Sequence, residues 1–149
     1  MSIDHRALME RYADIIGRNE WDALSGVFTS DAVVEFPQSG EVFRGIGNIR
    51  GQFENYPGSL AEGRIAAASV LAGEPTYALS PAYTVIAVEG TGKRGAATFR
   101  TQYPDGSKWW TVTHFETDGD RISQAQVFFA PEFEGPEWRA PFREAPPRN

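Results

Sequence analysis

The spacing of apolar residues along the chain changes from a helical repeat to a strand-like alternation near residue 60. Before that point, apolar residues recur every three or four positions from Leu8 onward and predict a first helix over residues 4–17. Beyond it, apolar and polar residues alternate in short runs separated by Gly, Pro and Asp, which is typical of half-buried strands. The predicted strands cover residues 63–72, 82–90, 95–103, 107–117 and 121–130. Helices followed by antiparallel hairpins indicate an α+β domain rather than a doubly wound one.

Two further helices and one strand are predicted before the alternation begins. Asn19 can cap a short second helix that includes Phe28, and residues 32–36 then form an extended segment. A third helix begins at Ile46 and ends at residues 56–58. Three predicted helices therefore precede most of the sheet.

The turn at residues 103–107 contains Pro, Asp and Gly in succession, and this chemistry fixes the register of the surrounding hairpin. It suits a three-residue loop with a glycine bulge, in which Tyr103 pairs with Ser107. The pairs that follow are Thr101 with Trp109, Phe99 with Thr111 and Ala97 with Thr113. A two-residue Asp-Gly turn would shift every pair by one residue. In the first register, one face carries Phe99, Thr101, Tyr103, Trp109, Thr111, Thr113 and Phe115, and the other carries Arg100, Gln102, Lys108, Trp110, Val112, His114 and Glu116.

The composition fits one domain and excludes several kinds of chemistry. A chain of 149 residues with 41% apolar and 13% aromatic residues can bury a sizeable core rich in rings. The 14 basic and 20 acidic residues give a net charge of −6 without a Lys/Arg cluster, so no nucleic acid partner is expected. The chain has no cysteine and two histidines, at positions 5 and 114, so thiol chemistry is excluded and neither a metal nor a cofactor is expected.

The two ends of the chain lead to expectations about location and domain bounds. No apolar run approaches the roughly 18 residues of a membrane span and no signal-peptide core follows the N-terminus, so we expect a cytoplasmic protein without a membrane partner. Five prolines between residues 131 and 149 predict an extended segment that lies over the surface. We therefore divide the chain into a domain of residues 1–135 and an extended, proline-rich tail of residues 136–149.

Several short segments of the chain match a known pattern in order and spacing. They read RYA at residues 11–13, NEWDAL at 19–24, FTSDAVVEFP at 28–37, NYPG at 55–58, THF through DGDRI at 113–122 and PEWR at 136–139. Together they resemble nuclear transport factor 2-like proteins, including ketosteroid isomerases and a bacterial SnoaL-like subgroup. The resemblance implies three N-terminal helices packed on a strongly curved, mostly antiparallel sheet that forms a conical pocket, a cystatin-like α+β barrel. Known members include isomerases, dehydratases, epoxide hydrolases and polyketide cyclases alongside purely binding modules, so the fold alone does not select the chemistry.

The resemblance to ketosteroid isomerases places three residues at the positions of catalytic groups. Tyr12 falls on the pocket tyrosine that donates a hydrogen bond to the developing enolate, although a tyrosine on a core-facing stripe can also serve only for packing. The proton-transferring carboxylate falls on Phe36, which cannot act as a base, and alternation sends the neighbouring Glu35 to the opposite face. The second oxyanion acid falls on Thr113, which can donate a hydrogen bond but does not titrate in a useful range. Steroid isomerisation by that mechanism is therefore not expected.

His114 is a further catalytic candidate, because histidine is the usual proton-transfer group near neutral pH. Alternation places it on the convex face if Thr113 faces the pocket, so the alternative is a role at the surface or in an interface. Arg44 and Arg50 could bind an anion near the third helix, or they could be solvated.

The pocket wall expected from these faces is aromatic with a few hydroxyl groups. Its members are Tyr12, Ile16, Phe36, Phe53, Tyr56, Phe99, Trp109, Thr111, Thr113, Phe115 and Phe129. Such a wall suits a small hydrophobic metabolite with one or two oxygen functions, transformed by cofactor-independent isomerase, lyase, hydrolase or cyclase chemistry. The alternative is a non-catalytic ligand-binding or dimeric assembly module whose cone is filled by its own side chains.

The convex face of the sheet is the expected homodimer interface, since the helices would cover only the concave side. This face carries Trp110, Val112, His114, Gln124, Gln126 and Phe128. Trp110, Val112 and Phe128 would form an apolar patch that monomers seldom expose. The resembling families usually pair sheet to sheet with two-fold symmetry. The alternative is that residues 131–149 fold back over this face, with Trp138 as the cover.

Overall fold

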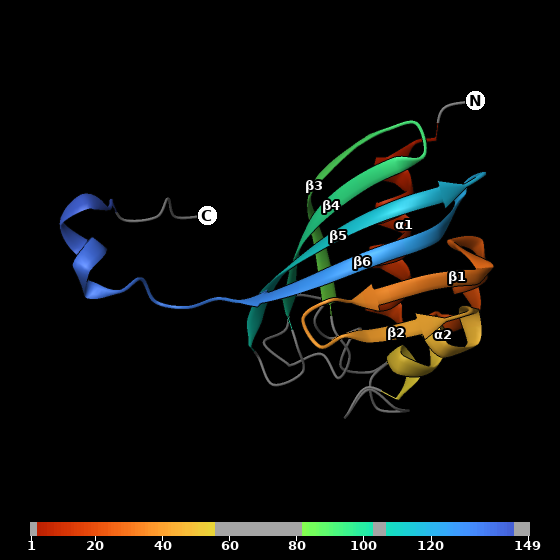
Figure 1. The fold of residues 1–149 in the computed structure, drawn as a ribbon, viewed down its shortest axis with the longest axis horizontal. Helices are drawn as coiled ribbons and strands as arrows, with labels where there is room; N and C mark the ends of the chain where they lie inside the picture. Colours follow the sequence, from red (N-terminus) through yellow and green to blue (C-terminus); the bar gives the residue numbers. More distant parts are fainter. Residues whose placement is uncertain (1–2, 56–81, 103–106, 145–149) are drawn as a thin grey trace.

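Six strands form one curved sheet in the part of the chain that the structure describes (Figure 1). The computed structural model describes residues 3–55, 82–102 and 107–144. The elements are α1 (His5–Arg18), the 3-10 helix η1 (Trp21–Gly26), β1 (Phe28–Phe36), β2 (Glu41–Arg44), α2 (Ile46–Glu54), β3 (Ala82–Thr91), β4 (Arg94–Gln102), β5 (Lys108–Asp118), β6 (Arg121–Pro131) and the 3-10 helix η2 (Glu137–Phe142). Tyr56, Tyr103 and the strand predicted over 63–72 lie outside the described residues.

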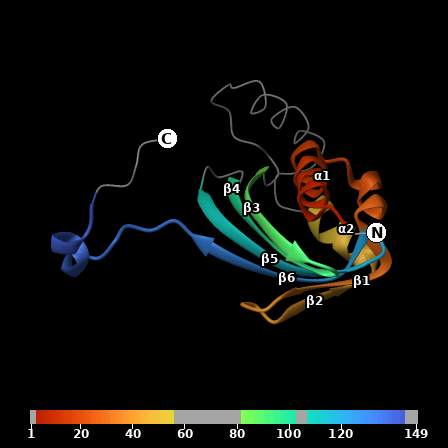
Figure 2. The same cartoon turned by 90° about the horizontal axis from the view of Figure 1, so that it is seen from above.

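The strand order is β2-β1-β6-β5-β4-β3, and neighbouring strands are antiparallel except for the parallel pair of β1 and β6. Helices α1 and α2 lie on the concave side of this sheet (Figure 2), where α1 packs against β3 and α2 packs against β1. The predicted α+β fold, with N-terminal helices on a strongly curved, mostly antiparallel sheet, is confirmed. The sheet stays open between its edge strands β2 and β3 rather than closing into a barrel. Among the described helices, none has the length and apolar character needed to cross a membrane.

The end of α1 differs from the sequence-based expectation at Asn19. The helix begins with Asp4, whose carboxylate accepts a hydrogen bond from the backbone N–H of Ala7 at 2.9 Å. Asn19 has a φ of 55° and its backbone N–H bonds the carbonyls at the end of α1, so it terminates that helix instead of capping η1. The reason is conformational, because asparagine adopts the left-handed region more readily than most residues and so commonly ends helices.

The first two strands also differ from the prediction. Strand β1 begins at Phe28, which pairs with Ile122 of β6, so Phe28 does not belong to the second helix. The chain then reverses after Phe36, whose carbonyl accepts a hydrogen bond from the N–H of Gly40 at 2.9 Å, and β2 pairs with β1. Strand β2 was not predicted because its four residues are too few to show alternation.

The register predicted from the turn at residues 103–107 is confirmed. Thr101 pairs with Trp109, Phe99 with Thr111 and Ala97 with Thr113. Side chains of the predicted inner face are buried: Ala97, Phe99, Thr101, Thr111, Thr113 and Phe115. The hydroxyl groups of Thr101 and Thr111 lie 2.8 Å apart and satisfy each other's hydrogen bonding in this interior.

The N-terminus of α1 packs against the sheet at a point where a glycine is required. Gly95 of β4 pairs with Phe115 of β5, and the rings of Phe115 and His5 lie with their centroids 5.7 Å apart. A Cβ atom on Gly95 would lie 2.3 Å from Cζ of Phe115 and 2.8 Å from Cδ2 of His5. The absence of a side chain at Gly95 therefore allows both rings to contact the backbone of β4.

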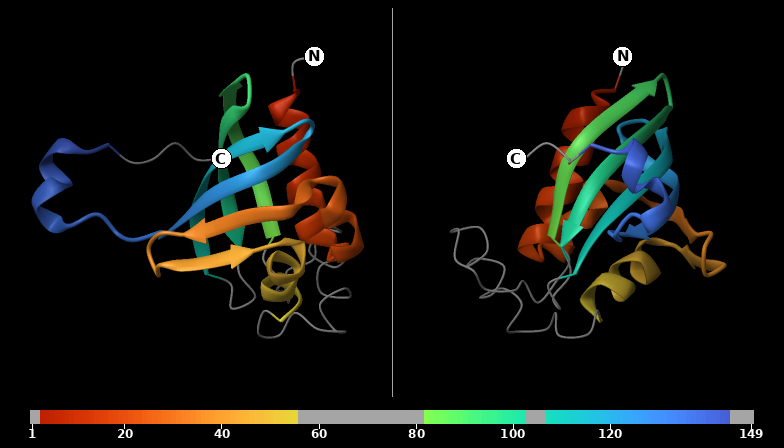
Figure 3. Two further views of the ribbon diagram at one scale, coloured as in Figure 1. Left: turned by 45° about the vertical axis from the view of Figure 1, so that its right-hand side comes forward. Right: turned by 90° about the vertical axis from the view of Figure 1, so that its left-hand side faces the viewer.

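The C-terminal segment projects away from the sheet and the helices (Figures 1 and 3). It was expected to be extended over the surface, but Glu137–Phe142 form η2, and none of its residues is buried. Pro136 precedes this helix with a φ of −65°, a value fixed by its ring that is compatible with a helix start. Residues 132–144 therefore do not cover the convex face of their own chain.

We predict that Gly95→Ala lowers the free energy of unfolding by about 1–3 kcal/mol, because the Phe115 and His5 rings must move to admit a methyl group. Gly47→Ala is the matched control, since a Cβ atom at this position of α2 meets no atom within 4 Å. The control should be neutral or stabilise by up to about 1 kcal/mol through helix propensity. Urea denaturation measures both changes. A Gly95→Ala chain as stable as the parent would show that the packing at β4 is looser than described.

Candidate functional site

A cavity of about 430 Å³ lies between the helices and the concave face of the sheet. Helices α1 and α2 supply one side of its wall, and strands β1, β2, β5 and β6 supply the other. Among the described residues, the wall comprises Met9, Tyr12, Phe28, Val34, Phe36, Phe43, Ile49, Gln52, Phe53, Ser107, Trp109, Thr113, Ile122, Ala125, Val127 and Phe129. Most of these side chains are hydrocarbon or aromatic, so the cavity is largely apolar.

Tyr12 is held in the wall by other aromatic rings. Its ring makes edge contacts with Phe28, Phe53 and Phe99 at centroid distances of 5.9, 6.4 and 6.0 Å. Phe53 in turn stacks on Trp21 of η1 at 5.6 Å. These contacts fix the orientation of the Tyr12 ring, since each edge-to-face pair is favourable beyond simple burial.

Phe36 occupies a second ring cluster in the same wall. Its ring lies 4.9 Å from Phe43 and 5.0 Å from Phe129, both in edge-to-face geometry. The side-chain amide of Gln38 ties the β1–β2 turn to β6, because it accepts a hydrogen bond from the N–H of Phe129 at 2.6 Å and donates one to its carbonyl at 2.7 Å. Phe36 and Phe129 are therefore held together by both ring packing and backbone bonding.

The polar groups that reach the cavity are few and uncharged. They belong to Tyr12, Gln52, Ser107, Trp109 and Thr113. The indole N–H of Trp109 donates to the hydroxyl of Ser107 at 2.9 Å. No Asp, Glu, His, Lys or Arg is found among the described lining residues. A charged ligand would lose its hydration on entering this part of the cavity without gaining a partner of opposite charge. That transfer costs free energy.

The catalytic candidates are divided between the two faces of the sheet. Tyr12 and Thr113 line the same cavity, and Phe36 lines it with them. His114 is exposed on the convex face, where its ring lies 6.2 Å from that of Phe128. Neighbouring residues of a strand point to opposite faces, so Thr113 and His114 cannot serve one site. Alternation in β1 has the same effect on Glu35, which lies on the convex side and accepts a hydrogen bond from Gln126 at 3.4 Å.

Six of the residues predicted to form the pocket line the cavity, and four are packed in the core instead. The lining residues are Tyr12, Phe36, Phe53, Trp109, Thr113 and Phe129, whereas Ile16, Phe99, Thr111 and Phe115 are buried in the core. The predicted inner face was correct for Phe99, Thr111 and Phe115, and Ile16 lies on the core-facing side of α1. Alternation does not tell which inner positions of the sheet are closed by packing. Phe99 and Phe115 are covered by ring contacts with Tyr12 and His5 of α1, and Thr111 is covered where its hydroxyl meets that of Thr101.

The other described lining residues were not predicted from the sequence. They are Met9, Phe28, Val34, Phe43, Ile49, Gln52, Ser107, Ile122, Ala125 and Val127. Several of them lie close along the chain to lining residues that were predicted. Alternation back from Phe36 and from Phe129 would have found Val34, Val127 and Ala125. Phe43 gave no such signal, because strand β2 was not predicted.

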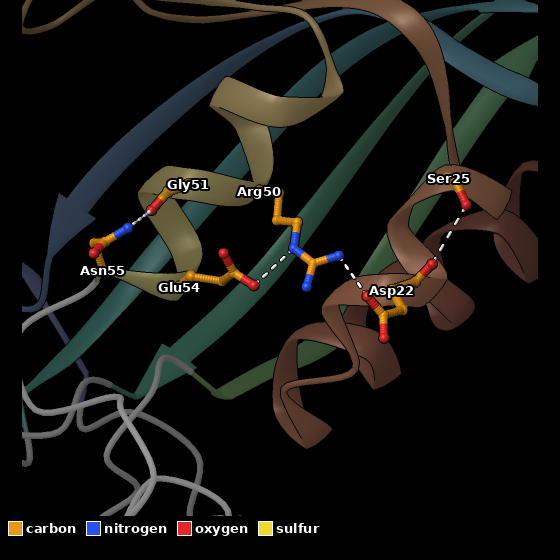
Figure 4. Close-up of polar contacts among 6 residues, drawn as sticks. All are labelled: Asp22, Ser25, Arg50, Gly51, Glu54 and Asn55. Carbon is orange, nitrogen blue, oxygen red and sulfur yellow. Dashed lines mark hydrogen bonds and ion pairs between the residues drawn. The ribbon is translucent and has the colours of Figure 1, made fainter.

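Arg50 is held by two carboxylates at the surface between η1 and α2 (Figure 4). Its guanidinium lies 2.5 Å from Asp22 and 2.7 Å from Glu54. Hydrogen bonds raise the pKa of Arg50 above its ordinary value, and the bond to Asp22 has a larger effect than the bond to Glu54. The arginine therefore joins the two helices rather than offering a vacant charge to an anion. Arg44 is exposed, and it borders a hollow on the convex side.

A metal site is not formed by the described residues. Among them, no group of three or more histidine or acidic side chains is arranged to hold a metal ion.

Comparisons with known proteins agree with the fold. A family model described as "SnoaL-like domain" matches residues 9–125 of the chain. A search of curated protein sequences finds no significant match.

Solved structures with the same fold cover most of the chain. A protein from Kribbella flavida DSM 17836, provisionally named a ketosteroid isomerase, is 20% identical with a TM-score of 0.72, over 97% of this chain and 90% of that chain. An NTF-2-like protein of unknown function from Burkholderia xenovorans LB400 is 20% identical with a TM-score of 0.71, over 95% and 94%. A protein from Sinorhizobium meliloti, provisionally named a polyketide cyclase, is 21% identical with a TM-score of 0.55, over 81% and 93%. At these identities the likeness shows the fold alone.

We predict that the chain does not isomerise 3-oxo-Δ5-steroids at an enzymatic rate, because Phe36 cannot carry a proton and Thr113 is not an acid in the useful pH range. The growth of conjugated-enone absorbance measures the reaction directly. If the rest of the cavity is competent, Phe36→Asp should exceed the parent by about 10²-fold.

Phe43→Asp is the matched control for that variant, since it adds the same carboxylate to the neighbouring ring position of the wall. It should stay at the level of the parent. Rapid conversion by the unmodified chain would contradict the prediction.

Proposed function

The chain belongs to the SnoaL-like domain family, and on that premise we propose that its cavity binds a small uncharged hydrophobic metabolite. If the protein is an enzyme, it also transforms this metabolite. The observation that carries the proposal is the apolar cavity beneath α1 and α2, whose described wall contains only neutral polar groups. Ligand sites are commonly built in this way, with an apolar surface for affinity and a few polar groups for orientation.

The size of the cavity supports a small ligand. Its volume of about 430 Å³ falls within the range of roughly 300–1,000 Å³ that is usual for small-molecule sites. Transfer of apolar surface from water contributes about 25 cal/mol per Å², so a compact ring system would gain most of its binding free energy from the hydrocarbon wall. The neutral polar groups would then decide which of several similar molecules fits.

Three polar side chains could orient an oxygen function of the ligand from different walls. Tyr12 extends from α1, Gln52 from α2 and Thr113 from β5. A phenol or an amide N–H can donate to a carbonyl oxygen and would stabilise negative charge that develops there. Isomerase, lyase, hydrolase or cyclase chemistry on such a ligand is therefore the enzymatic version of the proposal. The provisional names of the Kribbella and Sinorhizobium proteins belong to the same range of reactions.

A non-catalytic binding module is the second candidate function. The observation that favours it is Phe36, which places a hydrocarbon ring where the resembling isomerases hold their base. In this version the same neutral wall holds a ligand without changing it. The two candidates share the binding step and differ only in whether the ligand is recovered unaltered.

We predict that some members of a panel of small neutral aromatic and terpenoid alcohols and ketones raise the melting temperature of the protein. A ligand that binds only the folded state at 100 times its dissociation constant stabilises it by about 2.7 kcal/mol, which corresponds to a shift of several degrees. Differential scanning fluorimetry measures the shift. Val127→Phe should abolish it, because the added ring fills the cavity from β6.

The control for Val127→Phe is Val42→Phe, the same chemical change at an exposed residue of β2 that does not line the cavity. It should leave the ligand-dependent shift intact. Loss of the shift in both variants, or its survival in Val127→Phe, would place binding elsewhere. A panel without any stabiliser would count against the proposed ligand class.

We also propose that the protein is a homodimer through the convex face of the sheet. Trp110 and Phe128 are 38% and 36% exposed there, since α1 and α2 lie on the concave side and residues 132–144 lead away from the sheet. Two pairs of opposite charges beside them form within the chain, Arg94 with Glu116 and Arg100 with Glu132, each at 2.8 Å, and Glu35 and Arg44 also border this face. A face with exposed aromatic rings and paired charges beside them suits burial against its own copy, because a two-fold interface sets the same patch against itself.

We predict that light scattering coupled to gel filtration gives a dimer mass at micromolar concentration and that Trp110→Glu gives a monomer. The new carboxylate would be buried without a partner in the interface. Trp110→Phe is the control and should remain dimeric, since it keeps an aromatic ring at this position. A monomer mass for the unmodified chain would defeat the proposal.

A further inference from the structure

The C-terminal arm, defined as residues 132–144, carries the most exposed large apolar side chains in the described chain. Phe133, Trp138 and Phe142 are 76%, 72% and 87% exposed. The arm lies away from the sheet and from the helices (Figures 1 and 3). Three large rings left in water over such a short segment indicate a surface that is covered by a partner.

The arm has a defined shape of its own. The backbone N–H of Arg139 donates to the carbonyl of Pro136 at 3.1 Å, and the guanidinium of Arg143 donates to the same carbonyl at 3.2 Å. Nη1 of Arg143 lies beside Gly135, 2.8 Å from where a Cβ atom on that residue would be. Arg139 also lies over the Trp138 ring at 5.2 Å. An arm that is already shaped loses less conformational entropy when it docks.

The root of the arm is fixed to the convex face of the sheet. The N–H of Glu132 donates to the carbonyl of Lys108 at 3.1 Å, and its carboxylate pairs with Arg100 at 2.8 Å. The guanidinium of Arg100 lies 5.8 Å from the centre of the Trp110 ring. The arm therefore starts beside the aromatic patch through which the homodimer is proposed to form.

We propose that the C-terminal arm is a clasp that docks its three aromatic side chains on a second copy of this chain. The proposal rests on the proposed homodimer, to which it adds a second, separate contact. Extended residues span roughly 3.3 Å each and 3-10 residues roughly 2 Å each, so the arm up to the end of η2 spans at most roughly 30 Å. A domain of this size has a radius of gyration of roughly 14 Å, so an arm that starts at the interface is long enough to lie on the face of a partner.

Docking on the arm's own chain is the competing arrangement. It would require the chain to reverse direction between Glu132, which is fixed by Arg100, and Pro136, which begins η2. A second copy on the convex face meets the root of the arm without that reversal. The two arrangements differ in one measurable property, because only docking on a partner depends on protein concentration.

Limited trypsin digestion at several protein concentrations tests the clasp in the full chain. Trypsin cleaves after Arg139 and Arg143, and intact-mass spectrometry reports loss of the arm's end. We expect cleavage at both arginines to slow at least about tenfold as the concentration rises from well below to well above the dimer dissociation constant, because docking would protect them. Trp110→Glu should be cleaved rapidly at every concentration.

The apolar side chains themselves are tested by the triple variant Phe133→Ser, Trp138→Ser and Phe142→Ser. Its dimer dissociation constant should rise at least about tenfold in light scattering. The matched control is Glu134→Ser with Glu144→Ser, which changes the same arm but keeps the three rings. The control should dimerise as the parent does.

The outcomes separate the clasp from the homodimer on which it rests. A full chain that is monomeric at all concentrations overturns both proposals. A dimer whose arm is cleaved equally fast at all concentrations overturns the clasp alone. Protection that is strong and independent of concentration also overturns the clasp, since the arm would then be docked on its own chain. Loss of dimer affinity in the triple variant together with concentration-dependent protection supports it.

Discussion

Strand β5 lies between β4 and β6, so each of its side chains must face either the helices or the opposite surface of the sheet. Trp109, Thr113 and Phe115 face the helices, whereas Trp110 and His114 face away. A shift of one residue in register would exchange these two sets and place an imidazole in the cavity. The neutrality of the β5 residues in the described cavity wall and the aromatic character of the convex face are therefore two consequences of one register.

The neutral wall limits what the cavity can do chemically. Tyr12, Gln52 and Thr113 can exchange hydrogen bonds with an oxygen atom, but none of these groups ordinarily transfers a proton near neutral pH. Any rate enhancement by these side chains would come from orientation and from hydrogen bonds to a developing oxyanion. The ring cluster around Tyr12 is suited to that task, since its edge contacts with Phe28, Phe53 and Phe99 fix the orientation of the phenol.

Much of the fold could be predicted from sequence because its strongest signals are local. The Pro-Asp-Gly turn gave the register of β4 and β5, and alternation then gave the faces of both strands. Asn19 was misassigned because an asparagine can either begin a helix with its side chain or end one in the left-handed conformation. Strand β2 and helix η2 are short, and their conformation is set by pairing with β1 and by bonds to Pro136 rather than by periodicity.

The site was harder to predict than the fold because a cavity depends on packing between distant elements. Phe99 and Trp109 lie on the same face of the hairpin, yet Phe99 is completely covered while Trp109 borders the cavity. The difference arises from where α1 crosses the sheet, and no pattern within β4 or β5 records that position. Gln52 was missed for a similar reason, since a polar residue on a helix is usually solvated unless the helix packs over a cavity.

The central claim is that the cavity beneath α1 and α2 takes a neutral ligand, and methyl NMR tests it most directly. The protein would be titrated with a neutral aromatic ketone and with an aromatic carboxylate of similar size. The ketone should shift the methyl signals of cavity residues, namely Val34, Ile49, Ile122 and Val127, and leave those outside it, namely Val42, Ile86 and Val112, unchanged. The carboxylate should shift neither set. Equal shifts of the cavity methyls by both compounds, or shifts confined to the outer methyls, would contradict the account.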